Sequence, residues 1–230
     1  KAEESVNFDG YQTPVLTTVL KAAKAFVETQ NIDVNTLEGV GVSATGQIDS
    51  RKGIVAGTCG NFPNYINSPI QAELERLFGL PVTVANDANC MTLGEVWVGG
   101  AKGYTDVIGA ATTALVRAAQ KKDPAWKDGR AIFAAAEAGN ETVLALLDAW
   151  TDEIAQGLAG MVHIFNPQLI LIGGGVSAQQ KLLIEPIAAK VRASVMPAFA
   201  EGLEIRAAQL HNDAGMVGAV YYFRQQHGEA

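Results

Sequence analysis

The same junction occurs twice in the chain: a strand-like segment is followed by Asn-Asp-Ala and then by a helix-like stretch. The first copy is Asn86-Asp87-Ala88, directly after "GLPVTVA", and the second is Asn212-Asp213-Ala214. Asn and Asp are preferred helix N-caps, so each copy by itself predicts only the start of a helix. The repetition predicts a duplicated architecture, in which two related halves each join strands to helices in this way.

Strand-like and helix-like segments alternate along the rest of the chain. Helices are expected at residues 14–30, 69–78, 88–97, 140–165 and 212–226, and strands at 37–42, 81–85, 168–172 and 203–206, with a hairpin at 46–55. Ser68 is expected to cap the second helix in a capping box with Gln71, and Asn140 to cap the long fourth one. The alternation predicts an α/β protein with mostly covered sheets, divided between Gly99 and Thr105.

Charge and composition argue against several classes of function. The 230 residues carry a net charge of −7 and no polybasic run, so neither nucleic acid nor a membrane surface is an expected partner. Cys59 and Cys90 lie far apart, with no His or Cys at zinc-ligand spacing, which indicates reduced thiols. No apolar run could span a bilayer and no signal peptide is recognisable, so we expect a soluble, cytoplasmic protein.

Asp87 is the main candidate for chemistry. An alcohol is too weakly acidic to ionise at neutral pH, so an enzyme that makes it attack needs a carboxylate within hydrogen-bond reach. Asn86 beside it offers both a donor and an acceptor, which suits a sugar hydroxyl. The spacing alone is weakly specific, and the alternative, a capping aspartate, stays open at this point.

A glycine-rich turn is the second candidate. The residues from Gly173 to Ala178 fit G-x-G-x-x-A, after a strand and before a helix, which we interpret as a nucleotide contact. Only about fifty residues follow, with one clear strand, too few for a dinucleotide-binding half. Glycine also occurs in such turns simply because it lets backbones pack closely.

Five segments, taken together, resemble the ROK family (repressors, open reading frames and kinases). They are "VGVSATGQIDSRKGIV", "GNFPNY", "GLPVTVANDANCMTLGE", "FNPQLILIGGGVS" and "NDAGMVGAVYY", in family order and across nearly the whole chain. The family contains bacterial glucokinase-like sugar kinases and sugar-responsive repressors. The resemblance implies a two-domain actin/hexokinase-like (ribonuclease H-like) fold around a cleft, and ATP-dependent phosphorylation of a hexose with Mg²⁺.

The resemblance also implies roles for individual residues. Asp87 is then the catalytic base, Asn86 holds sugar hydroxyls, and Asp213 is left as a helix cap. The other residues that it places in contact with sugar or with the adenosine of ATP come from loops: Gly46 and Asn61 for the sugar, Gly174 and Gly175 for the nucleotide. The smaller, sugar-binding domain is expected at residues 1–105 with the C-terminal helix 213–230, and the larger, nucleotide-side domain at 106–212. A homodimer is expected from the family.

Some family segments are not visible in this sequence. They are an Asp-x-Gly-x-Thr phosphate loop, a second glycine-rich phosphate loop, sugar-binding Glu and His residues, and a Cys/His zinc motif. A strand is expected to start in "GYTDV", yet the residues from Gly109 onward are expected to be helical already. The strand then has no room, so a segment is expected to be missing near Val107-Ile108. Either the chain is a shortened relative, or the sequence omits segments of a longer chain, and we favour the second.

Two rival functions stay open. One is a non-catalytic sugar-sensing or effector domain of a ROK-type transcriptional regulator, against which the net charge of −7 and the retained Asp87 argue. The other is a NAD-linked enzyme that uses "IGGGVSA". The identity of the sugar is also open among glucose, fructose, N-acetylmannosamine and a β-glucoside.

Overall fold

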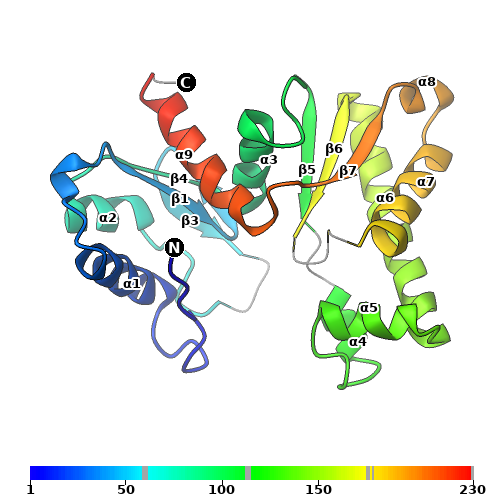
Figure 1. Cartoon of the computed structure of the whole chain (residues 1–230), viewed down its shortest axis with the longest axis horizontal. Helices are drawn as coiled ribbons and strands as arrows, with labels where there is room; N and C mark the ends of the chain where they lie inside the picture. Colours follow the sequence, from blue (N-terminus) through cyan, green and yellow to red (C-terminus); the bar gives the residue numbers. More distant parts are fainter. Residues whose placement is uncertain (59–61, 112–114, 175–176, 178, 229–230) are drawn as a thin grey trace. The chain divides into compact units, whose positions relative to one another are not determined.

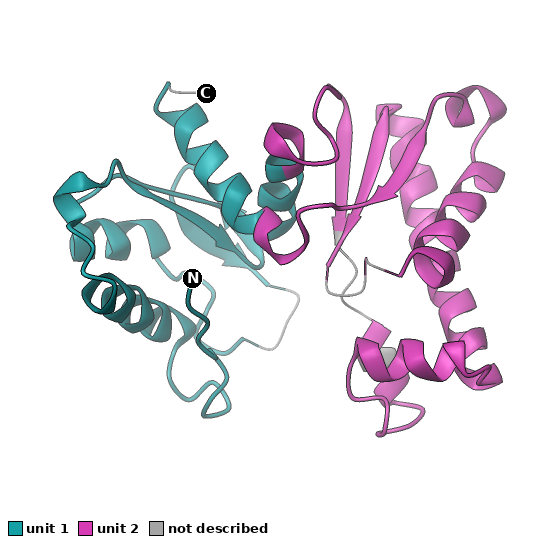
Figure 2. Ribbon diagram, in the orientation of Figure 1, with its two compact units in different colours: residues 1–94, 215–230 teal, residues 95–214 magenta. Residues whose placement is uncertain are grey.

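The computed structural model describes residues 1–58, 62–111, 115–174, 177 and 179–228 (Figure 1). The chain divides into two compact units, which Figure 2 distinguishes by colour. Unit 1 comprises residues 1–94 and 215–230, and unit 2 comprises residues 95–214. Within the described residues, no helix is both long enough and apolar enough to cross a bilayer.

Unit 1 contains two pairs of strands with helices around them. Its strands are β1 (Val40–Ala44), β2 (Gln47–Asp49), β3 (Ile54–Gly57) and β4 (Val82–Asn86). Its helices are α1 (Val15–Thr29), α2 (Ile70–Phe78), most of α3 (Asp87–Val98) and α9 (Ala214–Gln226), with the 3-10 turn η1 (Val34–Thr36). β1 and β4 pair in parallel, whereas β2 and β3 form an antiparallel hairpin.

The pairing of β1 with β4 determines which residues meet at the end of the sheet. The register runs from Val40 opposite Val82 to Ala44 opposite Asn86. Neighbouring parallel strands end at the same edge of a sheet, so the residues that follow them emerge side by side. Thr45 and Asp87 are these two residues.

α9 packs closely on both β1 and α3. A Cβ at Gly218 would lie 1.6 Å from the carbonyl oxygen of Cys90 in α3. A Cβ at Gly41 in β1 would lie 2.5 Å from the carbonyl oxygen of Ala219. Only glycine allows backbones to approach this closely, so these two residues fix the C-terminal helix against the strand and the helix that lead into the site.

Unit 2 is built on a parallel sheet in the order β5 (Val107–Ala111), β6 (Leu169–Gly173), β7 (Glu204–Ala207). Its longer helices are α4 (Leu115–Gln120), α5 (Gly129–Glu137), α6 (Glu141–Phe165) and α7 (Glu185–Ser194). Its shorter elements are the π-helix η2 (Gln180–Ile184), α8 (Pro197–Ala200) and the 3-10 turn η3 (His211–Asp213). Figure 1 shows α6 and α7 along one side of this sheet.

β6 is buried on both faces, as a central parallel strand should be. Ile170 and Ile172 belong to the large apolar cluster with α6 and α7, and Leu169 and Leu171 to a smaller cluster with Ala101. The carboxylate of Glu95, at the end of α3, is fully buried and accepts hydrogen bonds from the backbone amides of Gly100 (2.7 Å) and Leu210 (2.6 Å). A buried carboxylate needs such donors, and these two join the helix end to the loops beside the sheet.

α6 and α7 are also joined by a polar contact. The Lys190 ammonium in α7 donates hydrogen bonds to the Asp148 carboxylate (2.6 Å) and the Thr151 hydroxyl (2.9 Å), and lies 2.8 Å from the Asp152 carboxylate. The hydrogen bonds and charges of the two aspartates therefore hold one cation between the helices.

The strand that was expected to start in "GYTDV" does form, as β5, although the sequence had suggested that there was no room for it. Val107 to Ala111 pair residue by residue with Leu169 to Gly173, and α4 begins only at Leu115. The prediction that the residues from Gly109 are helical and leave no room for a strand is therefore wrong. Gly109, Ala110 and Ala111 are small residues whose weak local preference is overridden by the sheet hydrogen bonds with β6.

The predicted helix ends are partly right. Asn140 caps α6, because its side-chain oxygen accepts a hydrogen bond from the amide of Val143 (3.1 Å), and Gly79 ends α2 in the left-handed region at φ 67°. The predicted capping box of Ser68 and Gln71 is wrong. Pro69 occupies the N-cap position without a side-chain bond, and the Gln71 amide donates to Glu75 instead (2.9 Å). The backbone oxygen of Ser68 accepts from the amide of Val55 (3.3 Å), which holds this residue against β3.

Candidate active site

Asp87 and Asn86 stand where β4 ends and α3 begins. Asp87 is the first residue of α3, where a negative charge interacts favourably with the helix dipole. The side-chain oxygen of Asn86 accepts hydrogen bonds from the backbone amides of Ala88 (3.0 Å) and Asn89 (3.2 Å). The Asn-Asp-Ala junction therefore does cap the helix, as its composition predicts, and Asn86 makes most of the cap.

Asn86 also joins the helix start to the loop after β1. Its amide nitrogen donates to the carbonyl oxygen of Gly46 (2.8 Å) and to Oδ1 of Asp87 (2.9 Å). Gly46 has φ 109°, and a Cβ there would lie 2.7 Å from the carbonyl oxygen of Gly57, so this position requires glycine. All four hydrogen-bonding positions of the Asn86 amide are thus engaged within the chain. Direct binding of a sugar hydroxyl by Asn86 stays a prediction, and it would exchange one of these bonds.

The two oxygens of the Asp87 carboxylate have different surroundings. Oδ1 accepts from the Asn86 amide and from the backbone amide of Ala88, both at 2.9 Å and in partly buried positions. Oδ2 accepts from the hydroxyl of Thr45 at 2.9 Å, in an exposed position. Within the described residues no lysine, arginine or histidine forms an ion pair with Asp87. The carboxylate is fixed in direction while Oδ2 stays accessible.

The charge of Asp87 acts on two neighbouring side chains. Burial raises the pKa of the Tyr65 phenol, and the negative charge of Asp87 raises it further. Burial also raises the pKa of the Cys90 thiol; a hydrogen bond with Ser43 acts in the opposite direction, and the charge of Asp87 adds to the rise. A carboxylate disfavours a second negative charge only at short range, so Asp87 lies close to both groups.

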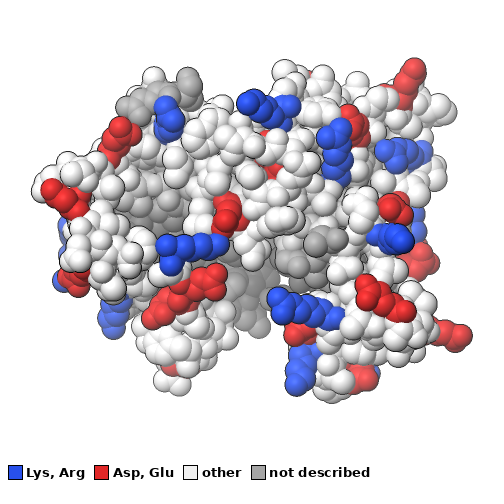
Figure 3. Space-filling view, in the orientation of Figure 1, with Lys and Arg blue, Asp and Glu red and all other residues white. Residues whose placement is uncertain are grey.

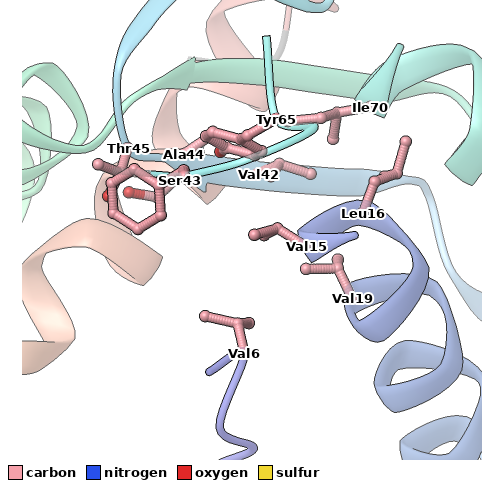
Figure 4. Close-up of a pocket in the computed structure, with 11 residues that line it drawn as sticks. Val6, Val15, Leu16, Val19, Val42, Ser43, Ala44, Thr45, Tyr65 and Ile70 are labelled. Atoms are coloured by element: carbon pink, nitrogen blue, oxygen red, sulfur yellow. The ribbon is translucent and has the colours of Figure 1, made fainter. Parts of the chain in front are cut away.

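A cavity of about 260 Å³ lies beside the end of β1 (Figure 4). Thr45 and Ser43 are at one end, and Leu16 and Val19 of α1 are at the other. Tyr65 also lines it, and most of the remaining wall is apolar. Thr45 therefore contacts the Asp87 carboxylate with its hydroxyl and also faces this cavity.

The glycine-rich turn lies in unit 2. Gly174 follows β6 with φ 103°, a backbone conformation that favours glycine, and its carbonyl oxygen accepts a hydrogen bond from the amide of Ser177 (3.1 Å). Gly175 and Asn61, the other two residues predicted in the sites, lie outside the described residues.

The described residues contain no group of three or more His, Cys, Asp or Glu side chains that could hold a metal ion. On the face drawn in Figure 3, Lys and Arg are interspersed with Asp and Glu and do not form one patch.

The sequence matches the ROK family over residues 3–111 and 109–226. The chain belongs to the ROK family. It is 28% identical to a glucokinase from Thermotoga maritima over 254 aligned positions, which include 82% of this chain and 80% of the relative. It is 29% identical to a beta-glucoside kinase from Klebsiella pneumoniae over 243 positions, with 82% and 78% covered.

The fold agrees with this assignment. The structure of a ROK family glucokinase from Streptomyces griseus, in complex with glucose and AMPPNP, superposes with a TM-score of 0.72 and 24% identity, covering 90% of this chain and 88% of that chain. The predicted α/β, actin/hexokinase-like fold is therefore confirmed.

The alignment with the Thermotoga glucokinase spans 254 positions, more than the 230 residues of this ROK chain. The glucokinase therefore has residues without a counterpart here. The family match is also in two pieces, which overlap at residues 109–111 within β5. That a segment is missing near Val107-Ile108 stays a prediction, as do the predicted domain limits.

Thr45 was not among the residues singled out in the sequence. The signal was present, because Thr45 directly follows β1 as Asp87 directly follows β4. Thr45 can be recognised as a neighbour of Asp87 only when β1 and β4 are known to be adjacent parallel strands. No local pattern in the sequence shows that these strands pair.

Proposed function

We propose that this ROK protein is an ATP-dependent sugar kinase that phosphorylates a hydroxyl of a hexose. One observation carries the proposal: the Asp87 carboxylate is held at Oδ1 by two donors, forms no ion pair among the described residues, and keeps Oδ2 accessible at the hydroxyl of Thr45. A carboxylate so arranged can serve as a general base. Relatives named glucokinase and beta-glucoside kinase support the reaction class.

In the proposed reaction, the O–H bond of the sugar breaks and its proton passes to Asp87. The sugar oxygen forms a bond to the γ-phosphorus, and the bond from that phosphorus to the bridging oxygen breaks, with its electron pair leaving on ADP. The transition state is loose, so Asp87 mainly orients the hydroxyl and accepts the proton late. Asp87 therefore acts both by orienting the sugar hydroxyl and by accepting its proton.

The remaining site residues are proposals of the same kind. Asn86, Gly46 and Asn61 would line the sugar site, and Gly174 and Gly175 would lie against the adenosine of ATP. Mg²⁺ would arrive with the ATP phosphates, which commonly supply much of its coordination, and would neutralise charge on the transferring group. The described residues contain no cluster suited to hold the ion by themselves, so no residue is assigned to it.

Glucose is the first substrate to test, because the Thermotoga maritima relative is named a glucokinase. A β-glucoside is the second, because the Klebsiella pneumoniae relative is named a beta-glucoside kinase. We propose that the protein acts in the cytoplasm, which suits a reaction between ATP and a hexose. We also propose that it is a homodimer.

The test compares Asp87→Asn with Asp213→Asn. The second variant makes the same chemical change in the repeated Asn-Asp-Ala motif, and so serves as a matched control. We expect Asp87→Asn to lower kcat for sugar-dependent ADP formation at least about 100-fold, the scale of a lost general base, while the Kd for the sugar changes less than about threefold. Asp213→Asn should keep its turnover.

Two results would contradict the proposal. Unchanged turnover in Asp87→Asn would reduce Asp87 to a helix cap. Saturable sugar binding without any ADP formation by the wild-type protein would favour the alternative of a non-catalytic sugar-sensing domain.

A further inference from the structure

The hydroxyl of Thr45 contacts Asp87, and Thr45 is one of the residues that line the cavity beside β1. The inference drawn from this position rests on the proposed function, because it concerns the proton transfer from the sugar. It concerns which oxygen of Asp87 takes the proton, and what holds that oxygen in place.

Hydrogen-bond capacity distinguishes the two oxygens. A carboxylate offers about four lone-pair positions, roughly two on each oxygen. Both positions of Oδ1 are used, by the amide of Asn86 and the backbone amide of Ala88. Among the described residues Oδ2 has one donor, the hydroxyl of Thr45. A proton from the substrate can therefore bind Oδ2 without displacing any existing donor.

The position of the Thr45 hydroxyl is fixed by its surroundings. The pairing of Ala44 with Asn86 places Thr45 beside Asp87, and on its other side Gly46 is held by the Asn86 amide at 2.8 Å. Threonine is branched at Cβ, so few side-chain rotamers are open to it. The backbone and the rotamer together keep the hydroxyl directed at Oδ2.

The hydroxyl also keeps acceptor capacity. It uses its one proton on Oδ2 and retains two lone pairs. Because Thr45 lines the cavity of about 260 Å³, a hydroxyl group that enters there could donate to these lone pairs. After proton transfer one position of Oδ2 carries the new proton, and the other still accepts from Thr45, so the contact persists through the step.

We propose that Thr45 is a positioning residue of this site: it holds Oδ2 of Asp87 as the oxygen that receives the proton of the sugar hydroxyl. Asn86 and the Ala88 amide hold Oδ1 and leave it no part in the transfer. The sugar O–H bond breaks as the Oδ2–H bond forms, and Thr45 keeps its own proton throughout.

The test uses Thr45→Val, which removes the hydroxyl at nearly constant shape, and Thr45→Ser, which keeps it. Thr36→Val is the control. It also removes a threonine hydroxyl that donates a hydrogen bond, in this case to the backbone oxygen of Asp33 (2.7 Å) in the turn before β1. We expect Thr45→Val to lower kcat about 10- to 100-fold, the effect of a misdirected catalytic group, with KM for the sugar changed less than about threefold. The kcat of Thr45→Ser should be within about fivefold of the wild-type kcat. The kcat of Thr36→Val should equal that of the wild type.

The double variant Thr45→Val/Asp87→Asn separates positioning from a general structural effect. If Thr45 acts through Asp87, the double variant should be no slower than Asp87→Asn alone. Additive losses in the double variant would overturn the inference, and so would a Thr45→Val protein with wild-type kcat. A wild-type protein that shows no sugar-dependent turnover would overturn the proposed function itself, and the inference with it, so the two failures are distinguished by the wild-type assay.

Discussion

The contact of α9 with α3 makes a sharp prediction, because one glycine determines it. A Cβ added at Gly218 would lie 1.6 Å from the carbonyl oxygen of Cys90, and real Cβ atoms essentially never approach within 3.0 Å, so the two helices would have to separate by roughly 1.4 Å. Forcing an extra group into a packed contact costs typically about 1–3 kcal/mol, and the group met here is rigid backbone. The higher helix propensity of alanine offsets about 1 kcal/mol of this cost. Because rigid backbone places the cost near the upper end of that range, we expect Gly218→Ala to lower the free energy of unfolding by about 2 kcal/mol.

Gly157→Ala is the matched substitution with the opposite sign. Gly157 is exposed within α6, and a Cβ there meets no atom within 4 Å, so only the gain in helix propensity remains. We expect it to raise the free energy of unfolding by about 0.5–1 kcal/mol. Urea unfolding followed by circular dichroism measures both changes, and the labelling rate of the buried Cys90 thiol reports on unit 1 separately.

Gly218→Ala should also impair turnover. Cys90 is in the first turns of the helix that begins with Asp87, so a shift of about 1 Å in α3 displaces the carboxylate and would lower kcat on the order of 100-fold. A Gly218→Ala protein with wild-type stability and labelling rate would refute the described contact between the helices.

Two further predictions concern charge. Asp87→Asn removes a negative charge that raises the pKa of the Tyr65 phenol, so that pKa should fall. Ultraviolet titration of Tyr65, with Tyr65→Phe as the blank, measures the pKa. An unchanged pKa would contradict the proximity of the two groups. Burial lowers the pKa of Lys190, but the hydrogen bonds and charges of Asp148 and Asp152 more than offset it, so the folded-state pKa is raised. The stabilisation is then fully present below the unfolded pKa and is lost as pH rises through the folded one. Lys190→Met should therefore be less stable than the wild type at pH 8, by an amount that shrinks above the ordinary lysine pKa of about 10.4; a difference that stays constant with pH would contradict it.

Local patterns in the sequence were sufficient where the structure depends on neighbours along the chain. Asn140 caps α6 through the amide three residues on, and Asn86 caps α3 in the same way. Ser68 looked equally suited to capping, but its backbone is held against β3 and its side chain makes no cap. Tertiary contacts thus override a capping preference that is worth only about 1 kcal/mol.

The parts that the sequence did not reveal depend on pairing between distant strands. Gly109 to Ala111 look helical until β6 is placed beside them. Thr45 and Asp87 are 42 residues apart, and only the register of β1 with β4 brings their side chains into contact. Such contacts follow from topology, which a pattern within one segment does not encode.

The most direct test of the central claim is detection of the product. The full-length protein is incubated with ATP, Mg²⁺ and glucose, then with a β-glucoside, and the sugar is analysed by mass spectrometry beside an Asp87→Asn sample. We expect the wild-type protein to produce a sugar that has gained one phosphoryl group, and the variant to produce very little of it. Equal amounts of phosphorylated sugar from both proteins would contradict the role of Asp87, and no phosphorylated sugar from either would contradict the kinase function.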